Sequence, residues 1–159
     1  MKLGKKYIIL IAIVVVAIVL DLVTKSMFGD ISYTNIIPNL INFETNHGNT
    51  GAAWGLFAGK KWLLIFIAII GLIIFILLDI FMIKSRSKLY LCGLGLYLGG
   101  TIGNLIDRIA LGYVRDFINF SFWPNFPTFN FADCFLCVGA TLLCVYLVFY
   151  FNKGKNGRS

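Results

Sequence analysis

Four long runs of apolar residues, separated by more polar segments, dominate the pattern of this chain. Each run is near the roughly 20 residues that an α-helix needs to cross a bilayer. The pattern predicts an integral membrane α-helical protein, a single domain over residues 1–159, with four transmembrane helices over about 7–25, 62–83, 89–107 and 133–151. The segments at about 26–61 and 108–132 would lie outside the membrane on one side.

Composition supports a membrane protein and excludes an ordinary soluble domain. The chain is 59% hydrophobic and 13% charged, against about 45–50% and about 25% in soluble domains. A basic start ahead of the first run is also typical of a signal peptide. No small-residue cleavage site follows this run, which ends in Asp21 and Lys25, so we expect a retained transmembrane helix.

Basic residues predict the orientation. Nine of the 14 Lys and Arg residues lie at ends of the runs that share one face, and the positive-inside rule makes that face cytoplasmic, with both termini inside. Topology and attraction to anionic phospholipids explain the net charge of +7, which therefore does not indicate nucleic acid. These nine residues are Lys2, Lys5, Lys6, Lys84, Arg86, Lys88, Lys153, Lys155 and Arg158.

The outer segments are too structured in composition to be plain linkers. Residues 31–46 combine β-branched and aromatic residues with Pro38 and several Asn, which predicts short strands and turns. Residues 109–126 contain Asp116 and Pro124 and make a poor fifth span. We expect a small extracytoplasmic β-rich cap, and an interfacial segment between helices three and four that carries Asp116 on irregular backbone. The aromatic residues that suit headgroup depth are Phe117, Phe120, Phe122, Trp123, Phe126 and Phe129.

Cysteine and histidine give no positive indication of chemistry. His47 falls in an outer segment, where we expect a loop residue without a catalytic role, and no Cys-His spacing suggests a metal site. We therefore expect no metal and no cofactor. All the cysteines fall in or beside the spans, where they are predicted to be small hydrophobic residues of the bundle: Cys92, Cys134, Cys137 and Cys144.

Small and polar residues gather in the third and first spans. Gly95, Gly99 and Gly103 recur at intervals of four, which predicts close approach of another helix. Beyond them, Asn104 lies one turn from Asp107 and Arg108, an arrangement that suits either structural anchoring or a site. Asp21 and Lys25 form an i,i+4 pair, which predicts an interfacial ion pair with a snorkelling lysine.

Two carboxylates are placed near the predicted outer face. Asn130 and Asp133 have the form of a helix start, with Asn as N-cap and an acid three residues on. Capping alone explains both, but it does not explain Asp116. A pair of carboxylates, one ionised to take a proton from water and one protonated to polarise a carbonyl, is the minimum equipment of an aspartic hydrolase.

Several motifs together resemble the lipoprotein signal peptidase family, also called signal peptidase II. The resemblance spans nearly the whole chain, and Trp54 stands where the family leads us to expect Phe. In order, the matching segments are Asp21 to Lys25, Asn49 to Trp54, Gly100 to Arg108, Val114 to Asp116 and Asn130 to Asp133.

The resemblance implies an aspartic endopeptidase that removes signal peptides from diacylglyceryl-modified bacterial prolipoproteins, cutting before the lipidated cysteine. It implies the cytoplasmic membrane of a bacterial cell, an active site at the outer face, inhibition by globomycin, and Asp116 and Asp133 as the catalytic dyad. Further residues implied near the substrate or supporting the dyad are Asn49, Gly51, Asn104, Arg108 and Asn130, and those implied as structural or site-shaping are Asp21, Lys25 and Asp107.

Helix position predicts how the two carboxylates divide their roles. Asp133 lies in the first turn of the fourth helix, whose positive end favours an anion, so Asp116 is the expected proton holder. We expect a monomer that meets its lipid-dissolved substrate within the bilayer. Two other classes stay open: a small transporter, whose coupling carboxylate should lie mid-span, and a membrane scaffold, which needs neither acid.

Overall fold

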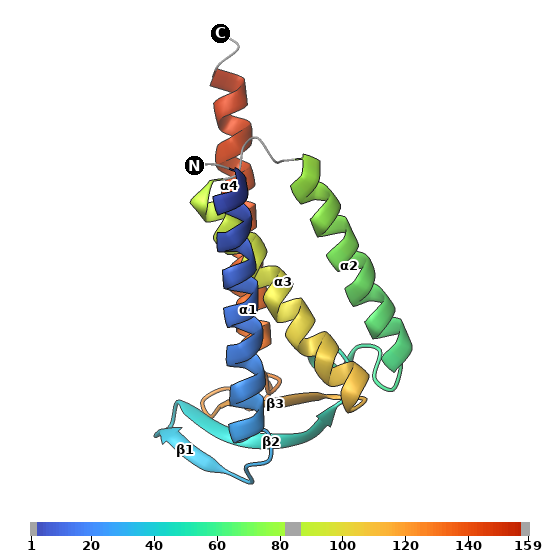
Figure 1. The fold of residues 1–159 in the computed structure, drawn as a ribbon. Helices are drawn as coiled ribbons and strands as arrows, with labels where there is room; N and C mark the ends of the chain where they lie inside the picture. Colours follow the sequence, from blue (N-terminus) through green and yellow to red (C-terminus); the bar gives the residue numbers. More distant parts are fainter. Residues whose placement is uncertain (1–2, 82–86, 157–159) are drawn as a thin grey trace.

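The protein is described by a computed structural model over residues 3–81 and 87–156, and its ribbon shows long helices above a small sheet (Figure 1). Within these residues, four helices are long and apolar enough to cross a membrane, as predicted. The predicted end of the second span at residue 83 lies outside the described residues, as do Lys2, Lys84, Arg86 and Arg158. The helices are α1 Leu3–Phe28, α2 Lys61–Phe81, α3 Lys88–Ala110 and α4 Phe131–Asn156.

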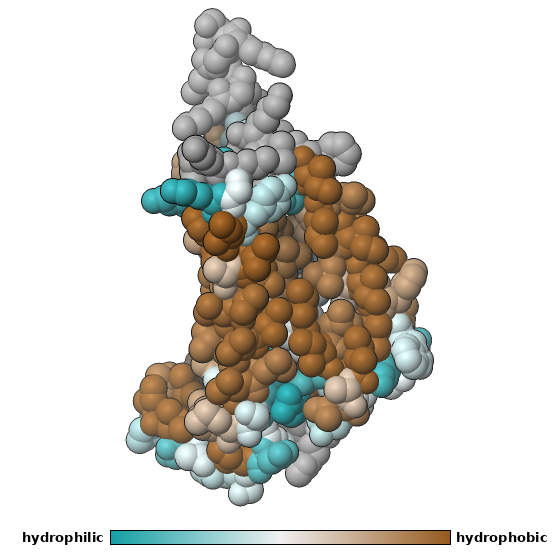
Figure 2. Space-filling view, in the orientation of Figure 1, coloured by the Kyte–Doolittle hydropathy of each residue, from teal (hydrophilic) through white to brown (hydrophobic). Residues whose placement is uncertain are grey.

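Helix α3 is the centre of the bundle. It packs against α1, α2 and α4, and 56% of its apolar span is buried inside the protein, against 17–22% for the other spans. The sheet lies at the end opposite the start of α1 and the end of α4 (Figure 1). A broad hydrophobic band covers the helices in the face seen in Figure 2, with hydrophilic residues gathered mainly at its two ends. This is the surface of a multi-pass membrane protein; which end is cytoplasmic stays a prediction.

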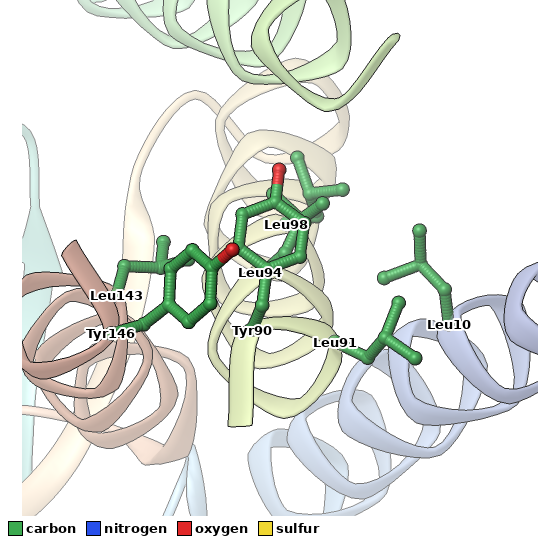
Figure 3. Packing of buried hydrophobic residues seen from close by; sticks show 7 residues of the cluster. All are labelled: Leu10, Tyr90, Leu91, Leu94, Leu98, Leu143 and Tyr146. Atoms are coloured by element: carbon green, nitrogen blue, oxygen red, sulfur yellow. The ribbon is translucent and has the colours of Figure 1, made fainter. Parts of the chain in front are cut away.

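Leucine and tyrosine side chains join α3 to its neighbours near the end away from the sheet. The ring of Tyr90 of α3 packs at a tilt against that of Tyr146 of α4, with ring centroids 5.0 Å apart. Leu91 of α3 faces Leu10 of α1 (Figure 3). The full buried cluster is Leu10, Tyr90, Leu91, Leu94, Leu98, Leu143 and Tyr146.

Glycines let the helices approach closely, which confirms the prediction for α3. A Cβ at Gly95 would meet the Ile13 side chain of α1 at 2.6 Å, and one at Gly99 would meet Ala17 Cβ of α1 at the same distance. These contacts leave no room for a side chain. The exposed cysteines Cys92, Cys137 and Cys144 were wrongly expected inside the bundle, because they lie on its outer surface.

The close contact of α3 and α4 gives a test of this packing. At Gly139, a Cβ would lie 2.6 Å from Tyr97 N and 2.8 Å from Gly93 O, and backbone atoms cannot move aside cheaply. We expect Gly139→Ala to cost about 1–3 kcal/mol and to lower the melting temperature in detergent. The matched control is Gly71→Ala, which has open space and should be neutral or slightly stabilising. Equal melting temperatures for the two variants would contradict the packing described.

The cap is an antiparallel sheet of three strands in the order β1-β2-β3. Its strands are β1 Thr34–Ile37, β2 Ile41–Asn49 and β3 Val114–Phe120. Short strands were correctly predicted for residues 31–46. The prediction of irregular backbone at Asp116 is wrong, because β3 pairs with β2 and carries this residue. His47 is likewise in strand β2 and not in a loop, and its side chain lies outside the described residues.

Aromatic side chains fix the sheet under α1. Phe28 of α1, Phe43 of β2 and Phe117 of β3 have ring centroids 4.8–5.6 Å apart. Phe117 is fully buried within the protein, so its ring packs against the protein and does not contact headgroups. Phe122 and Trp123 are exposed, as the expected headgroup depth requires. The sheet is thereby held at a fixed position below the helix ends.

Candidate active site

Asp116 and Asp133 reach the same site from a strand and a helix. Asp116 is on β3 and only 1% exposed, while Asp133 is half-buried in the first turn of α4. A short bridge joins the two elements: Ile118 N donates to Phe129 O at 2.8 Å, and Phe129 N donates to Ile118 O at 3.0 Å. Because Asn130 follows Phe129, this bridge sets the start of α4 beside β3.

Asn130 contacts both carboxylates. Asp133 N donates to Asn130 Oδ1 at 3.0 Å and Asn130 N donates to Asp133 Oδ2 at 3.1 Å, which is the predicted capping box. The side-chain NH₂ group of Asn130 donates from Nδ2 to Asp116 Oδ1 at 2.6 Å. The residue that caps the helix therefore also links the two acids.

Two further asparagines complete the donors to these acids. Asn104 of α3 donates from Nδ2 to Asp133 Oδ1 at 2.8 Å. Asn49, the last residue of β2, donates from Nδ2 to Asp116 Oδ2 at 2.8 Å. With the two contacts from Asn130, each of the four carboxylate oxygens accepts one N–H group.

Burial and charge make Asp116 hard to ionise. Desolvation is the larger cause and the nearby charge of Asp133 the second, and together they raise the pKa of Asp116 from the ordinary 3.8 to about 7. Hydrogen bonds from Asn49 and Asn130 act in the opposite direction without cancelling the rise. This carboxyl therefore keeps its proton at pH values where an ordinary aspartate has lost it.

A buried ionic layer supports the site from behind. Lys25 Nζ donates to Asp21 Oδ2 at 2.7 Å and to Asn104 Oδ1 at 2.9 Å, and it lies 3.6 Å from Asp107 Oδ2. The side chain of Lys25 has no exposed area, so the predicted snorkelling lysine is wrong. Asp21 also accepts from Ala132 N at 2.9 Å, which ties α1 to the start of α4.

Arg115 is a supporting residue that sequence reasoning did not single out. Its Nη2 donates to Asp107 Oδ1 at 2.7 Å, and its backbone N donates to Asp107 Oδ2 at 3.0 Å. The pair fastens β3 to the end of α3 and so fixes the strand that carries Asp116. Its position next to Asp116 was the only signal, and the partner lies eight residues away on another element.

Arg108 and Gly51 form the rim of the site. Arg108 Nη2 donates to Gly51 O at 2.9 Å, and Gly51 N donates to Asn49 Oδ1 at 2.9 Å. Arg108 lies within electrostatic reach of Asp116 and Asp133. Its Nε is buried and has no hydrogen-bond partner among the described residues. It is therefore available to an acceptor that the protein itself does not supply.

Trp54 marks the outer edge of this region. It lies in a 3-10 turn, Ala53–Gly55, with a φ of 55°, and its side chain is 73% exposed. Its ring meets that of Phe126 at a centroid distance of 6.2 Å.

The structure brings Asn49, Asn104 and Asn130 directly onto the acids, with the remaining expected residues placed behind them or at the rim.

The fold and this site together define a multi-pass membrane protein with a linked pair of carboxylates where its helices meet a small sheet. The family model described as "Signal peptidase (SPase) II" matches residues 13–149 of the chain. The chain therefore belongs to the signal peptidase II family of peptidases, as the motifs predicted.

Similar proteins carry the same description. A "Lipoprotein signal peptidase" of Symbiobacterium thermophilum is 39% identical over 150 residues, covering 91% of this chain and 97% of that protein. One of Lactiplantibacillus plantarum is 37% identical, with 87% and 90% covered. A solved structure described as a bacterial membrane enzyme, obtained by the in meso method, superposes with a TM-score of 0.76 at 34% identity, with 87% of each chain covered.

Proposed function

We propose that the protein is an aspartic endopeptidase that removes signal peptides from diacylglyceryl-modified prolipoproteins, with Asp116 and Asp133 as its catalytic dyad. One observation carries the assignment: Asn130 contacts both acids, and no structural task requires Asp116 to meet the cap of α4. The buried carboxylates behind the site are paired with cations, Asp21 with Lys25 and Asp107 with Arg115. The dyad instead accepts neutral amide donors.

The dyad holds one proton in the resting enzyme. The pKa of Asp116, raised to about 7, makes this residue the proton holder of the dyad. Charge balance supports the same state. The site and its ionic layer contain the carboxylates of Asp21, Asp107, Asp116 and Asp133 and the cations of Lys25, Arg108 and Arg115, so one bound proton makes the group neutral.

Hydrolysis then follows from the positions of the two acids. Asp133 takes a proton from water, and the resulting hydroxide attacks the scissile carbonyl carbon. The proton on Asp116 hydrogen-bonds the developing oxyanion. When the tetrahedral intermediate collapses, Asp116 protonates the leaving amine of the lipidated cysteine and the carbon–nitrogen bond breaks. The dyad titrates as a unit, so this division of roles describes its dominant microstate.

A substrate dissolved in the bilayer can reach this site without leaving the membrane. The dyad lies where the helix ends meet the sheet, which is where hydrocarbon gives way to water if the sheet is extracytoplasmic. The Nε of Arg108, which has no hydrogen-bond partner within the described part of the chain, is suited to a peptide carbonyl of the substrate. We place the enzyme in the bacterial cytoplasmic membrane among its phospholipids, with the dyad at the outer face, and expect globomycin-type inhibitors to bind there.

Purified protein in lipid vesicles tests the substrate assignment. We expect it to convert a diacylglyceryl-modified precursor to a product whose first residue is the lipidated cysteine, identified by mass spectrometry. The same precursor without the lipid is the matched control and should be cleaved far more slowly. No cleavage of the modified precursor would reject the function and favour the transporter class.

The raised pKa of Asp116 predicts an alkaline limit to activity. The protonated carboxyl is required in the proposed mechanism, and it is lost as the pH rises through about 7. We expect kcat/KM to fall about tenfold for each further pH unit, with a midpoint near 7 for the free enzyme. Cleavage rates at low substrate concentration from pH 5 to 9 measure this. Activity that keeps rising from pH 7 to 9 would contradict a protonated Asp116.

A further inference from the structure

Lys25 is a buried cation that is separated from the dyad by a single side chain, that of Asn104. It lies on α1, it is 1% exposed, and it donates to Asn104 Oδ1 at 2.9 Å. It also pairs with Asp21 at 2.7 Å and lies 3.6 Å from Asp107. Two carboxylates are thus available to neutralise it, and the Asn104 oxygen is a further, uncharged acceptor for its three N–H groups.

The ammonium group constrains the amide because it can only donate. The atom of Asn104 that faces Lys25 must be its oxygen, and this turns Nδ2 of Asn104 toward Asp133. The same oxygen accepts from Asn130 Nδ2 at 3.1 Å. The orientation of the Asn130 amide is equally fixed, since Asp133 N must meet the oxygen of Asn130. A reversed Asn104 would set its own N–H groups against Lys25 and Asn130.

We infer that Lys25 is a positioning residue of the reaction: it holds Asn104 as a donor to Asp133 and keeps a positive charge beside the dyad. This inference rests on the proposed dyad. Every carboxylate oxygen already accepts one N–H group, which leaves the shared proton to the lone pairs that face the substrate. Lys25 thereby sets how tightly the dyad holds that proton, without touching the substrate.

Loss of Lys25 should change the pKa of Asp116 in a defined direction. The charge of Lys25 lowers the pKa of Asp116, against the larger raising effects of burial and of Asp133. Without it, the proton is held more tightly, and Asn104 becomes a weaker donor because only Asn130 still donates to its oxygen. Arg108 of α3 also lies near the dyad and remains, while Asp21 of α1 and Asp107 of α3 face Lys25 itself. The alkaline limb of activity should therefore move to higher pH.

The test uses a variant in which the buried charge stays balanced. Asp21→Asn/Lys25→Met removes one charge of each sign, and Asp21→Asn alone is the matched control that keeps Lys25 on Asn104. For the double variant we expect kcat to fall about 10- to 100-fold, as on loss of an outer-shell partner, with KM unchanged. Its alkaline midpoint should lie at least about half a pH unit above that of Asp21→Asn, less than the shift of about 1–3 units caused by a charge in direct contact.

In the control, the alkaline midpoint should stay at the wild-type value or fall, since one negative charge has gone. If the double variant does not melt cooperatively in detergent, Asp21→Asn/Lys25→Gln supplies the measurement: it keeps a donor for Asn104 without the charge, so kcat should fall less while the midpoint still lies above that of Asp21→Asn. If the folded double variant has the same midpoint as the Asp21→Asn control, whether or not kcat falls, the inference is overturned and Lys25 is a structural residue.

The same assay separates this inference from the proposed function. Wild-type cleavage together with loss of cleavage in Asp116→Asn keeps the dyad, whatever the Lys25 variants show. Cleavage by Asp116→Asn, or none by the wild type, would remove the dyad and with it the role of Lys25.

Discussion

An Asp133→Asn variant should fold with helix α4 still capped and cleave no precursor. The oxygen of the new amide can accept from Asn130 N, as Asp133 Oδ2 does now at 3.1 Å. Its NH₂ group must then face Nδ2 of Asn104, so one hydrogen bond is lost, at a cost of about 0.5–1.5 kcal/mol. An amide cannot take a proton from water, and loss of a general base costs about 10²- to 10⁴-fold in rate.

Comparison with Asp133→Ala separates the two roles of this side chain. Alanine removes the cap contact as well, and loss of a helix cap costs about 0.5–2 kcal/mol. We therefore expect a lower melting temperature for Asp133→Ala than for Asp133→Asn, and equal loss of cleavage in both. Residual activity that follows melting temperature would indicate that Asp133 acts only as a cap.

Asp116→Asn should also lose cleavage, and it should change how stability depends on pH. The carboxyl has a pKa of 3.8 in the unfolded chain and about 7 in the folded protein, so the folded state binds the proton more tightly. This contribution to stability is full below pH 3.8 and is lost as the pH rises through about 7. Asparagine has no charge to bury, so the variant should escape this loss.

Plots of melting temperature against pH for wild type and Asp116→Asn should therefore cross. At pH 5 the variant should be less stable, because its NH₂ group faces one of the amide donors, Asn49 or Asn130, and a hydrogen bond worth about 0.5–1.5 kcal/mol is lost. At pH 8 the variant should be the more stable protein. Melting temperatures in one detergent from pH 5 to 8 measure this, and parallel curves would show that Asp116 is ionised throughout.

Much of this structure follows from local sequence patterns. The spans were predictable because length and apolarity fix a transmembrane helix, and the contacts of Gly95 and Gly99 because small residues at every fourth position form one face. The Asn130–Asp133 cap is also local, since both partners lie within one helical turn. The family motifs added the pairing of Asp116 with Asp133, which no local pattern gives.

The features that were missed depend on contacts between distant segments. Asp116 lies on a strand because β3 pairs with β2, although both α2 and α3 lie between these strands in the sequence. Pairing between such distant segments has no local signal. Lys25 is buried because Asp107 and Asn104 arrive from α3; with Asp21 alone, a lysine at a helix end would extend to water. Arg115 was overlooked for the same reason, as its partner is set by the fold.

The most direct measurement is the single-turnover rate at which wild type, Asp116→Asn and Asp133→Asn cleave one diacylglyceryl-modified precursor in the same vesicles. Each protein is first shown to melt cooperatively, so that a lost rate reports chemistry. We expect the product that begins at the lipidated cysteine from the wild type alone. Cleavage at the wild-type rate by either variant would contradict the dyad of Asp116 and Asp133.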